Sequence, residues 1–153
     1  MGRFPAVLTI AAMLLLGGAL LPVPAGRVLA SEPEMPPYPE RGLKGPVSAD
    51  RLPVPENPVL LHGRDVWEGT CKVCHGPGIA GAPKITGTRF WAKRIEQDLP
   101  VLFDHAKNGF SGSSGTMPAR GGNAELSDAD IEAAVRFMVS NSGGQDIALD
   151  GLQ

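Results

Sequence analysis

The pentapeptide Cys71-Lys72-Val73-Cys74-His75 constrains this chain most, because it holds the only two cysteines among 153 residues. The rest of the chain offers little material for a core. Aromatic residues make up 5% of the sequence, whereas it contains 20 glycines and 15 prolines. Small domains bury only a modest fraction of their surface. A covalently held apolar ligand would therefore supplement the core of such a chain.

Three kinds of site would use two thiols and an imidazole at this spacing. A thioredoxin-like redox disulfide belongs to a fold with alternating strands and helices, and no clear strand signal occurs here. A closed zinc site needs four ligands, but the chain has only two cysteines and three histidines. Covalent haem uses all three residues: each thiol adds to a vinyl group and the histidine binds the iron. The pentapeptide therefore favours one covalent haem c per chain, attached at Cys71 and Cys74 and ligated by His75.

Met117 is the residue we expect at the second axial position of the iron. Three of the five methionines lie within the first 35 residues, in a targeting segment and a proline-rich stretch. Met138 continues an apolar helical stripe and is expected in the core. Met117 lies before a proline in a glycine-rich loop, where a tertiary requirement best explains a lone methionine. His62 and His105 are the remaining candidates, and both are expected on helix surfaces.

Residues 1–30 read as a targeting segment that exports the chain to the periplasm. An arginine at position 3 is followed by an apolar stretch centred on Leu14-Leu15-Leu16, and Val28-Leu29-Ala30 has the pattern of a signal-peptidase site. We expect cleavage after Ala30. The alternative is an uncleaved anchor, which would tether the protein to the membrane through its N-terminus.

The charge of the chain argues against nucleic-acid binding. The formal net charge is −2, and removal of residues 1–30, with their two arginines and no acidic residue, would leave −4. No basic patch with interleaved aromatic residues occurs. Partners must therefore be sought among other classes of molecule.

Four segments are predicted along the chain. After the signal peptide, residues 31–58 form a proline-rich extended arm, because the prolines forbid helix and interrupt sheet. An arm lying along the domain surface is the alternative. Residues 59–142 form the folded domain, and residues 143–153 form a flexible C-terminal tail.

The folded domain is predicted to be all-α with long loops. A first helix runs from about Pro58 or His62 to Cys74. Two further helices cover residues 90–96 and 99–107, with apolar residues at helical spacing. The last helix begins at Ser127, whose side chain pairs with Asp130 in a capping-box-like arrangement. Residues 76–88 and 108–123 are predicted to be loops.

The first helix resembles that of the class I cytochromes c. Gly63, Trp67 and Cys71 are spaced four apart, so that they share one helix face, and the glycine lets two backbones approach closely. In that family the small residue and the aromatic cross the C-terminal helix. The counterparts here would be Ala134 and Phe137.

Further motifs are similar to the bacterial cytochrome c-five type, and the resemblance covers about half the chain, from Leu61 to Val139. No additional cysteine pair is present, unlike in some members of that group, and the proline-rich arm lies outside the resemblance. The motifs, in chain order, are Gly81-Ala82-Pro83-Lys84-Ile85, Trp91-Ala92-Lys93-Arg94-Ile95, Asn108-Gly109-Phe110, Met117-Pro118-Ala119-Arg120-Gly121-Gly122-Asn123 and Leu126-Ser127-Asp128.

The resemblance implies a small helical domain wrapped around one low-spin haem c, with His75 and Met117 as the axial ligands. It implies that the Pro83 carbonyl accepts a hydrogen bond from the axial histidine. Trp91 and Arg94 are expected to bind the haem propionates, and Ile85 and Phe110 to line the pocket. A positive ring around the haem would comprise Lys72, Lys84, Lys93, Arg94 and Arg120.

The implied function is one-electron transfer, since two filled axial positions leave no site for a substrate on the iron. The leading hypothesis is an electron carrier, not an enzyme, whose redox protein partners are a membrane electron-transfer complex and a terminal oxidase or dehydrogenase. The alternative is a haem subunit of an exported dehydrogenase, docked through residues 31–58. A haem-free thiol–disulfide oxidoreductase and a ligand-binding haem sensor are the remaining hypotheses.

Overall fold

The structure, a computed structural model, describes residue 2 and residues 38–152. The chain divides into two units, residues 1–30 and residues 31–153, and the helices and strands described below belong to the second unit. The predicted signal peptide or anchor lies outside the described residues, apart from residue 2. Among the described residues, no helix has the length and apolar character needed to cross a membrane.

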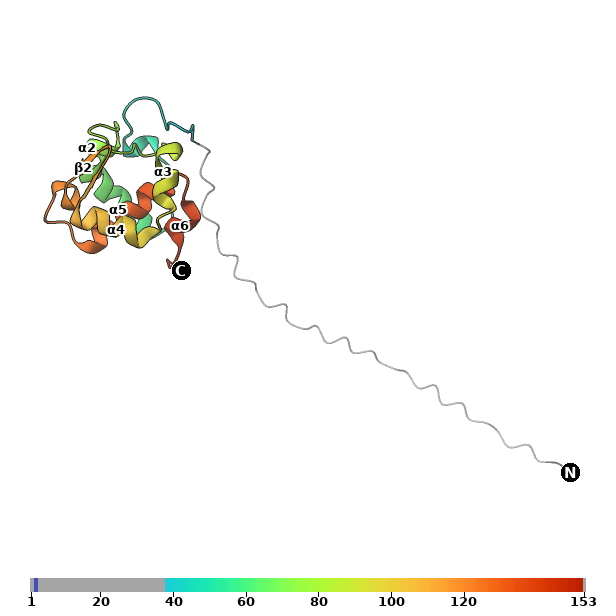
Figure 1. Cartoon of the computed structure of the whole chain (residues 1–153). Helices are drawn as coiled ribbons and strands as arrows, with labels where there is room; N and C mark the ends of the chain where they lie inside the picture. Colours follow the sequence, from blue (N-terminus) through green and yellow to red (C-terminus); the bar gives the residue numbers. More distant parts are fainter. Residues whose placement is uncertain (1, 3–37, 153) are drawn as a thin grey trace. The chain divides into compact units, whose positions relative to one another are not determined.

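The second unit is a set of helices with one short hairpin, which confirms the predicted all-α class (Figure 1). The helical segments in chain order are η1 (Ala49–Arg51), α1 (Pro58–Val66), the π-helical turn η2 (Trp67–Cys71), α2 (Lys72–His75), α3 (Thr88–Ile95), α4 (Leu99–Asn108), η3 (Ala119–Gly122), α5 (Asp128–Ser140) and α6 (Gln145–Leu149).

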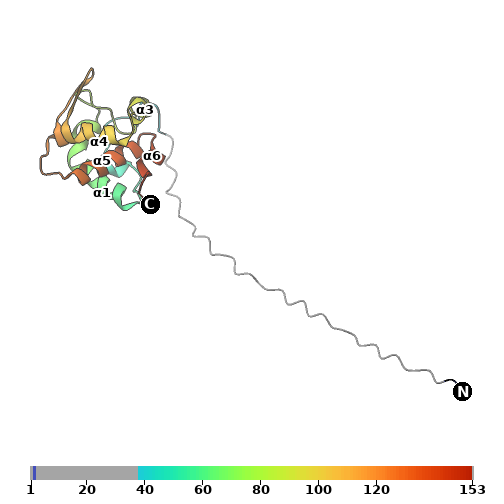
Figure 2. The same ribbon diagram turned by 60° about the horizontal axis from the view of Figure 1, so that its bottom comes forward.

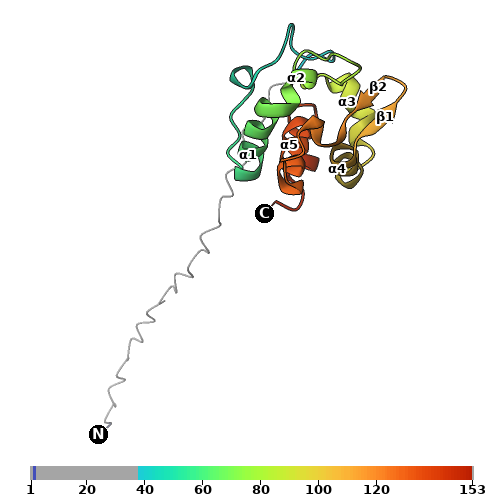
Figure 3. The ribbon, with the colours of Figure 1, turned by 90° about the vertical axis from the view of Figure 1, so that its left-hand side faces the viewer.

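α1 and α5 cross at a glycine, and the close approach of the two backbones requires one. A Cβ placed on Gly63 would lie 2.0 Å from the carbonyl oxygen of Ala133. One turn further on, the ring centroids of Trp67 and Phe137 lie 5.7 Å apart, and neither side chain is exposed. Figure 3 shows the two helices side by side. The predicted crossing is confirmed, with the closest contact at Ala133 instead of Ala134.

Side chains cap both of these helices at their first turns. The side-chain oxygen of Asn57 accepts two backbone N–H groups of α1, and Pro58 occupies the first turn, where no N–H partner is needed. At α5, the Asp130 N–H donates to the Ser127 hydroxyl and the Ser127 N–H donates to the Asp130 carboxylate. The predicted capping box is therefore present.

A hairpin occupies part of the segment that we predicted to be loop. Strand β1 (Phe110–Gly112) pairs antiparallel with β2 (Gly115–Met117), and Phe110 lies opposite Met117. In Figure 2 the hairpin projects beside α4. The strands are three residues each and rich in glycine and serine, so they carry no alternating apolar pattern that sequence reasoning could detect.

Residues 38–52, named the strap, do not form the free extended arm that we predicted. Val47, Ala49 and Leu52 are buried in the hydrophobic core. The backbone N–H groups of Val47 and Ala49 bond to the Gly76 carbonyl at 3.1 Å and the Glu68 carboxylate at 2.8 Å. The prediction of an extended arm is therefore wrong for these residues.

The error over the strap has a simple physical origin. Proline removes backbone donors and excludes helix, but it does not prevent neighbouring apolar side chains from packing. The remaining backbone groups find partners on the domain: the Leu43 N–H donates to the Thr86 hydroxyl at 3.0 Å, and the Lys84 ammonium donates to the carbonyls of Leu43 and Gly45. This corresponds to the alternative in which the segment lies along the domain.

The predicted flexible tail is also wrong, because α6 packs against α5. Ala148 is fully buried in the core. The Arg136 guanidinium of α5 donates to the carbonyls of Ala148 and Asp150 at 2.7 and 2.9 Å. A five-residue helix has too few positions to reveal a period, and its stability comes from these tertiary contacts.

Candidate functional site

A cavity of about 680 Å³ lies against the pentapeptide. Cys71, Cys74 and His75 line it, and so does Met117 from β2. Folding thus brings the predicted second axial residue into the same cavity as the three residues of the motif. The volume is in the range of cofactor pockets.

The backbone of the following loop fixes the imidazole of His75. Its Nδ1 lies 2.8 Å from the Pro83 carbonyl oxygen. Because a carbonyl can only accept, Nδ1 carries the proton and Nε2 keeps its lone pair free for a metal. The side chain is 7% exposed. Burial lowers the pKa of His75, and the positive charge of Arg94 adds to this against the opposing effect of the Pro83 bond.

The two cysteines are free, half-buried thiols on the cavity wall. Burial raises the pKa of Cys71 to about 11. Redox-active thiols have lowered pKa values, so this environment does not favour the thiol–disulfide alternative. In the described part of the chain, no group of three or more His, Cys, Asp and Glu residues is placed so that it could hold a metal ion.

The hairpin and two helices supply another part of the cavity wall. Met117 and Phe110 face each other across the two strands, and both line the cavity. Apolar side chains from α4 and α5 complete this part: Leu102, Val135 and Met138, each less than 9% exposed. Met138 thus belongs to the core, as predicted, and also borders the cavity.

One predicted surface histidine lies in the site instead. His105 on α4 lines the cavity, and its ring centroid is 4.3 Å from that of Phe110. The charged residues that flank His105 led to the prediction of a surface position. The sequence does not show that tertiary packing turns this face of α4 toward the hairpin. His62 remains a surface residue whose Nε2 lies 2.6 Å from the Asp130 carboxylate.

The remaining predicted contacts divide into those that line the cavity and one that does not. Trp91 and Arg94 line it. The indole N–H of Trp91 donates to the Lys84 carbonyl at 2.9 Å, so its hydrogen is engaged with protein, contrary to the predicted propionate bond. Ile85 is fully buried in the core and is not among the lining residues.

The predicted ring of positive charge is smaller than the sequence indicated. Lys93 and Arg94 are the charged side chains that line the cavity. The other three are engaged elsewhere: Lys72 pairs with Glu68, Lys84 binds the strap, and Arg120 pairs with Asp128.

The residues present fit a covalently attached haem. The wall combines two thiols in the attachment spacing, a neutral imidazole with one free nitrogen, a thioether and a mainly apolar lining. Imidazole and thioether are both axial ligands of haem iron in proteins. Lys93 and Arg94, which also line the cavity, would supply positive charge near the two carboxylates of the group.

Known proteins with similar sequences identify the family of this chain. Residues 58–138 match the model of a family described as cytochrome C oxidase, cbb3-type, subunit III. Cytochrome c-555 of Chlorobaculum tepidum is 41% identical over 80 residues, covering 52% of this chain and 74% of that protein. Cytochrome c5 of Ectopseudomonas mendocina is 33% identical over 76 residues, covering 48% of this chain and 83% of that protein.

A solved structure is also similar. It is entitled a crystal structure of an electron transfer complex of nitrite reductase with cytochrome c, and the matching chain is 32% identical. The match covers 53% of this chain and 94% of that chain, with a TM-score of 0.47. The family match and the c-555 and c5 relatives are sufficient without it: this chain belongs to the class I monohaem cytochromes c and carries covalently bound haem c.

Proposed function

We propose that this cytochrome carries single electrons between redox proteins, with its haem attached at Cys71 and Cys74 and ligated axially by His75 and Met117. The observation that carries the proposal is that all four residues line one cavity although Met117 is distant in sequence. His105, which lines the same cavity, is the rival for the second axial position.

The haem iron supplies the one-electron chemistry, and the residues of the chain orient the haem and tune its reduction potential. The hydrogen bond from His75 to the Pro83 carbonyl orients the imidazole and raises its basicity toward the metal. The thioether of Met117 is a soft ligand that favours the ferrous state and raises the reduction potential. The apolar wall acts in the same direction, because it disfavours the extra positive charge of the ferric state.

We infer export to the periplasm from residues 1–30, which carry the pattern of a cleaved signal peptide. The attachment motif supports this inference, because covalent haem attachment fits an exported protein. The segment lies outside the described residues, so the inference depends on the sequence.

Partners would dock transiently at the mouth of the cavity. Val73 and Ile79 line it and are 66% and 51% exposed. Electron-transfer encounters bury little surface, so a small apolar area is sufficient, and Lys93 and Arg94 add positive charge to the wall of the same cavity. The alternative, a subunit docked through residues 31–58, is not favoured, because the strap part of that arm is bound to its own domain.

A potentiometric titration of the purified holoprotein, followed by its visible spectrum, tests the proposal. We expect a single one-electron wave and a ferrous spectrum that carbon monoxide does not change, because both axial positions are filled. His105→Ala should behave in the same way. A ferrous spectrum altered by carbon monoxide would indicate an open iron and favour ligand binding or catalysis.

A further inference from the structure

Arg120 has a backbone conformation that does not suit its residue type. It lies in η3, on the segment that leads away from Met117, with φ 54° and ψ 27°. This left-handed region is unfavourable for residues with a Cβ other than asparagine and aspartate. The two glycines that follow also have positive φ values. An arginine between Ala119 and these glycines therefore needs side-chain contacts that offset its strain.

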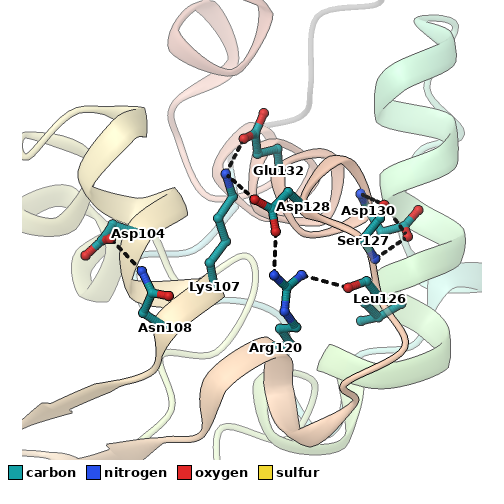
Figure 4. A network of polar contacts seen from close by, with 9 residues as sticks. All are labelled: Asp104, Lys107, Asn108, Arg120, Leu126, Ser127, Asp128, Asp130 and Glu132. Carbon is teal, nitrogen blue, oxygen red and sulfur yellow. Dashed lines mark hydrogen bonds and ion pairs between the residues drawn. The ribbon is translucent and has the colours of Figure 1, made fainter.

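Those contacts tie the segment to the start of α5. The guanidinium donates to the Leu126 carbonyl at 2.7 Å and to the Asp128 carboxylate at 2.5 Å (Figure 4). Two acceptors on one planar guanidinium fix its orientation as well as its position. The side chain is 29% exposed, so water reaches it only in part. The bond from Arg120 is also the main cause of the lowered pKa of Asp128.

A second cation fastens the other end of the hairpin to the same end of α5. Lys107, at the end of α4, lies 2.5 Å from the Glu132 carboxylate and 3.6 Å from that of Asp128. Gly109, between α4 and β1, packs closely on the backbone of Met117. A Cβ on Gly109 would lie 3.0 Å from the Met117 carbonyl oxygen. Both chain segments that flank the hairpin are thus fixed to α5.

We propose that Arg120 is a positioning residue for the axial ligand, holding the Met117 segment against the cavity through its contacts with Leu126 and Asp128. This inference rests on the proposed function, in which Met117 ligates the iron. Loss of the contacts would increase the population of molecules in which the thioether has left the iron. The proposal changes nothing in the covalent attachment at Cys71 and Cys74.

The chain provides a matched control at the same end of α5. His62 contacts Asp130 in the first turn of that helix, but it comes from α1 and does not reach the hairpin. Loss of this contact affects the anchoring of α5 without releasing Met117. A general loosening of the α5 N-terminus and a specific release of the ligand can therefore be separated.

The experiment measures two properties of the ferric holoprotein: the weak red absorption band of methionine-bound iron and the dissociation constant for added imidazole. The variants are Arg120→Asn and Arg120→Lys. Asparagine suits the left-handed backbone but is too short to reach Leu126 and Asp128, whereas lysine can reach one of these two acceptors. We expect Arg120→Asn to weaken the band and to bind imidazole about tenfold more tightly, a typical coupling factor. Arg120→Lys should fall between it and the wild type, and His62→Ala should match the wild type.

Three results would overturn the proposal. An unchanged band and imidazole affinity in Arg120→Asn would show that the contacts of Arg120 with Leu126 and Asp128 do not act on Met117. An equal change in His62→Ala would assign the effect to the helix end in general. Absence of the band from the wild type would remove Met117 as a ligand, which would refute the proposed axial pair itself and not only the role of Arg120.

Discussion

Two backbone carbonyls of one loop bind the polar hydrogens of two rings beside the cavity. Pro83 accepts from His75, and Lys84 accepts from Trp91. The ring centroids lie 6.2 Å apart, so the loop between them acts as a common support. Because peptide carbonyls do not titrate, this support is expected to be independent of pH wherever the fold is intact.

Replacing Trp91 with phenylalanine tests the role of the indole N–H. The variant leaves the Lys84 carbonyl without its partner in a site where Trp91 is 4% exposed. We expect a loss of about 1–2 kcal/mol in the free energy of unfolding, measured by denaturant titration of the holoprotein. The reduction potential and its pH dependence should stay as in the wild type. A shifted pH dependence of the potential would instead restore the propionate role for Trp91.

At the scale of elements, α5 connects most of the domain. It crosses α1 at Gly63, carries Phe137 against Trp67, and contacts α6 through Arg136. Its N-terminal half holds Asp128 and Glu132, the acidic residues that bind Arg120 and Lys107 (Figure 4). A single helix thus supports the attachment helix on one side and the ligand hairpin on another.

The α1–α5 crossing is expected to reject any side chain at residue 63. Gly63→Ala would place a Cβ within 2.0 Å of a backbone oxygen, which cannot move without displacing α5. We expect a loss of at least about 3 kcal/mol in the free energy of unfolding, measured in urea. Asp65→Ala, at an exposed position of the same helix, should stay within about 0.5 kcal/mol of the wild type. Equal stability of the two variants would contradict the close crossing.

The capping box makes the stability of α5 depend on acid. Hydrogen bonds from Ser127, and then from His62, lower the pKa of Asp130 from 3.8 to about 2. Because the folded-state pKa is lower than the unfolded one, this contribution is complete above about pH 4 and is lost as the pH falls through about 2. We expect the difference in urea midpoint between wild type and Asp130→Asn to shrink over that interval. A difference that is constant down to pH 2 would contradict the assignment.

Sequence patterns predicted those elements whose signals are local. The attachment motif, the apolar stripe of α5 and the cap at Ser127 each depend on residues within a few positions of one another. The strap, α6 and the contacts of Arg120 depend instead on partners far along the chain, which no periodicity reveals. His105 was misplaced for the same reason. Met117 could be predicted as a ligand only because the alternatives were few.

At the scale of the whole described unit, the strap makes the folded domain longer than the motif-bearing region. It closes over the loop that follows the pentapeptide, contacting Gly76 through Val47 and Thr86 through Leu43. The core that surrounds the cavity therefore includes residues that precede α1. A shortened protein that begins at residue 58 would lack these residues.

Val47 and Val54 provide a matched test of the strap. Val47 is 1% exposed, whereas Val54, just beyond the strap, is 61% exposed. We expect Val47→Ala to lower the free energy of unfolding by about 2 kcal/mol, from lost burial and the space left behind. Val54→Ala should change it by less than about 0.5 kcal/mol. Thermal unfolding of the two holoproteins gives the comparison, and equal midpoints would mean that the strap does not contribute to the core.

The ferric visible spectrum of the holoprotein, recorded beside that of Met117→Ala, tests the central claim most directly. The chain should be expressed with its own N-terminal segment and a cytochrome c maturation system. We predict a low-spin c-type spectrum with the weak red band of methionine-bound iron, and loss of that band in Met117→Ala. A high-spin wild-type spectrum, or a red band that survives in the variant, would contradict ligation by His75 and Met117.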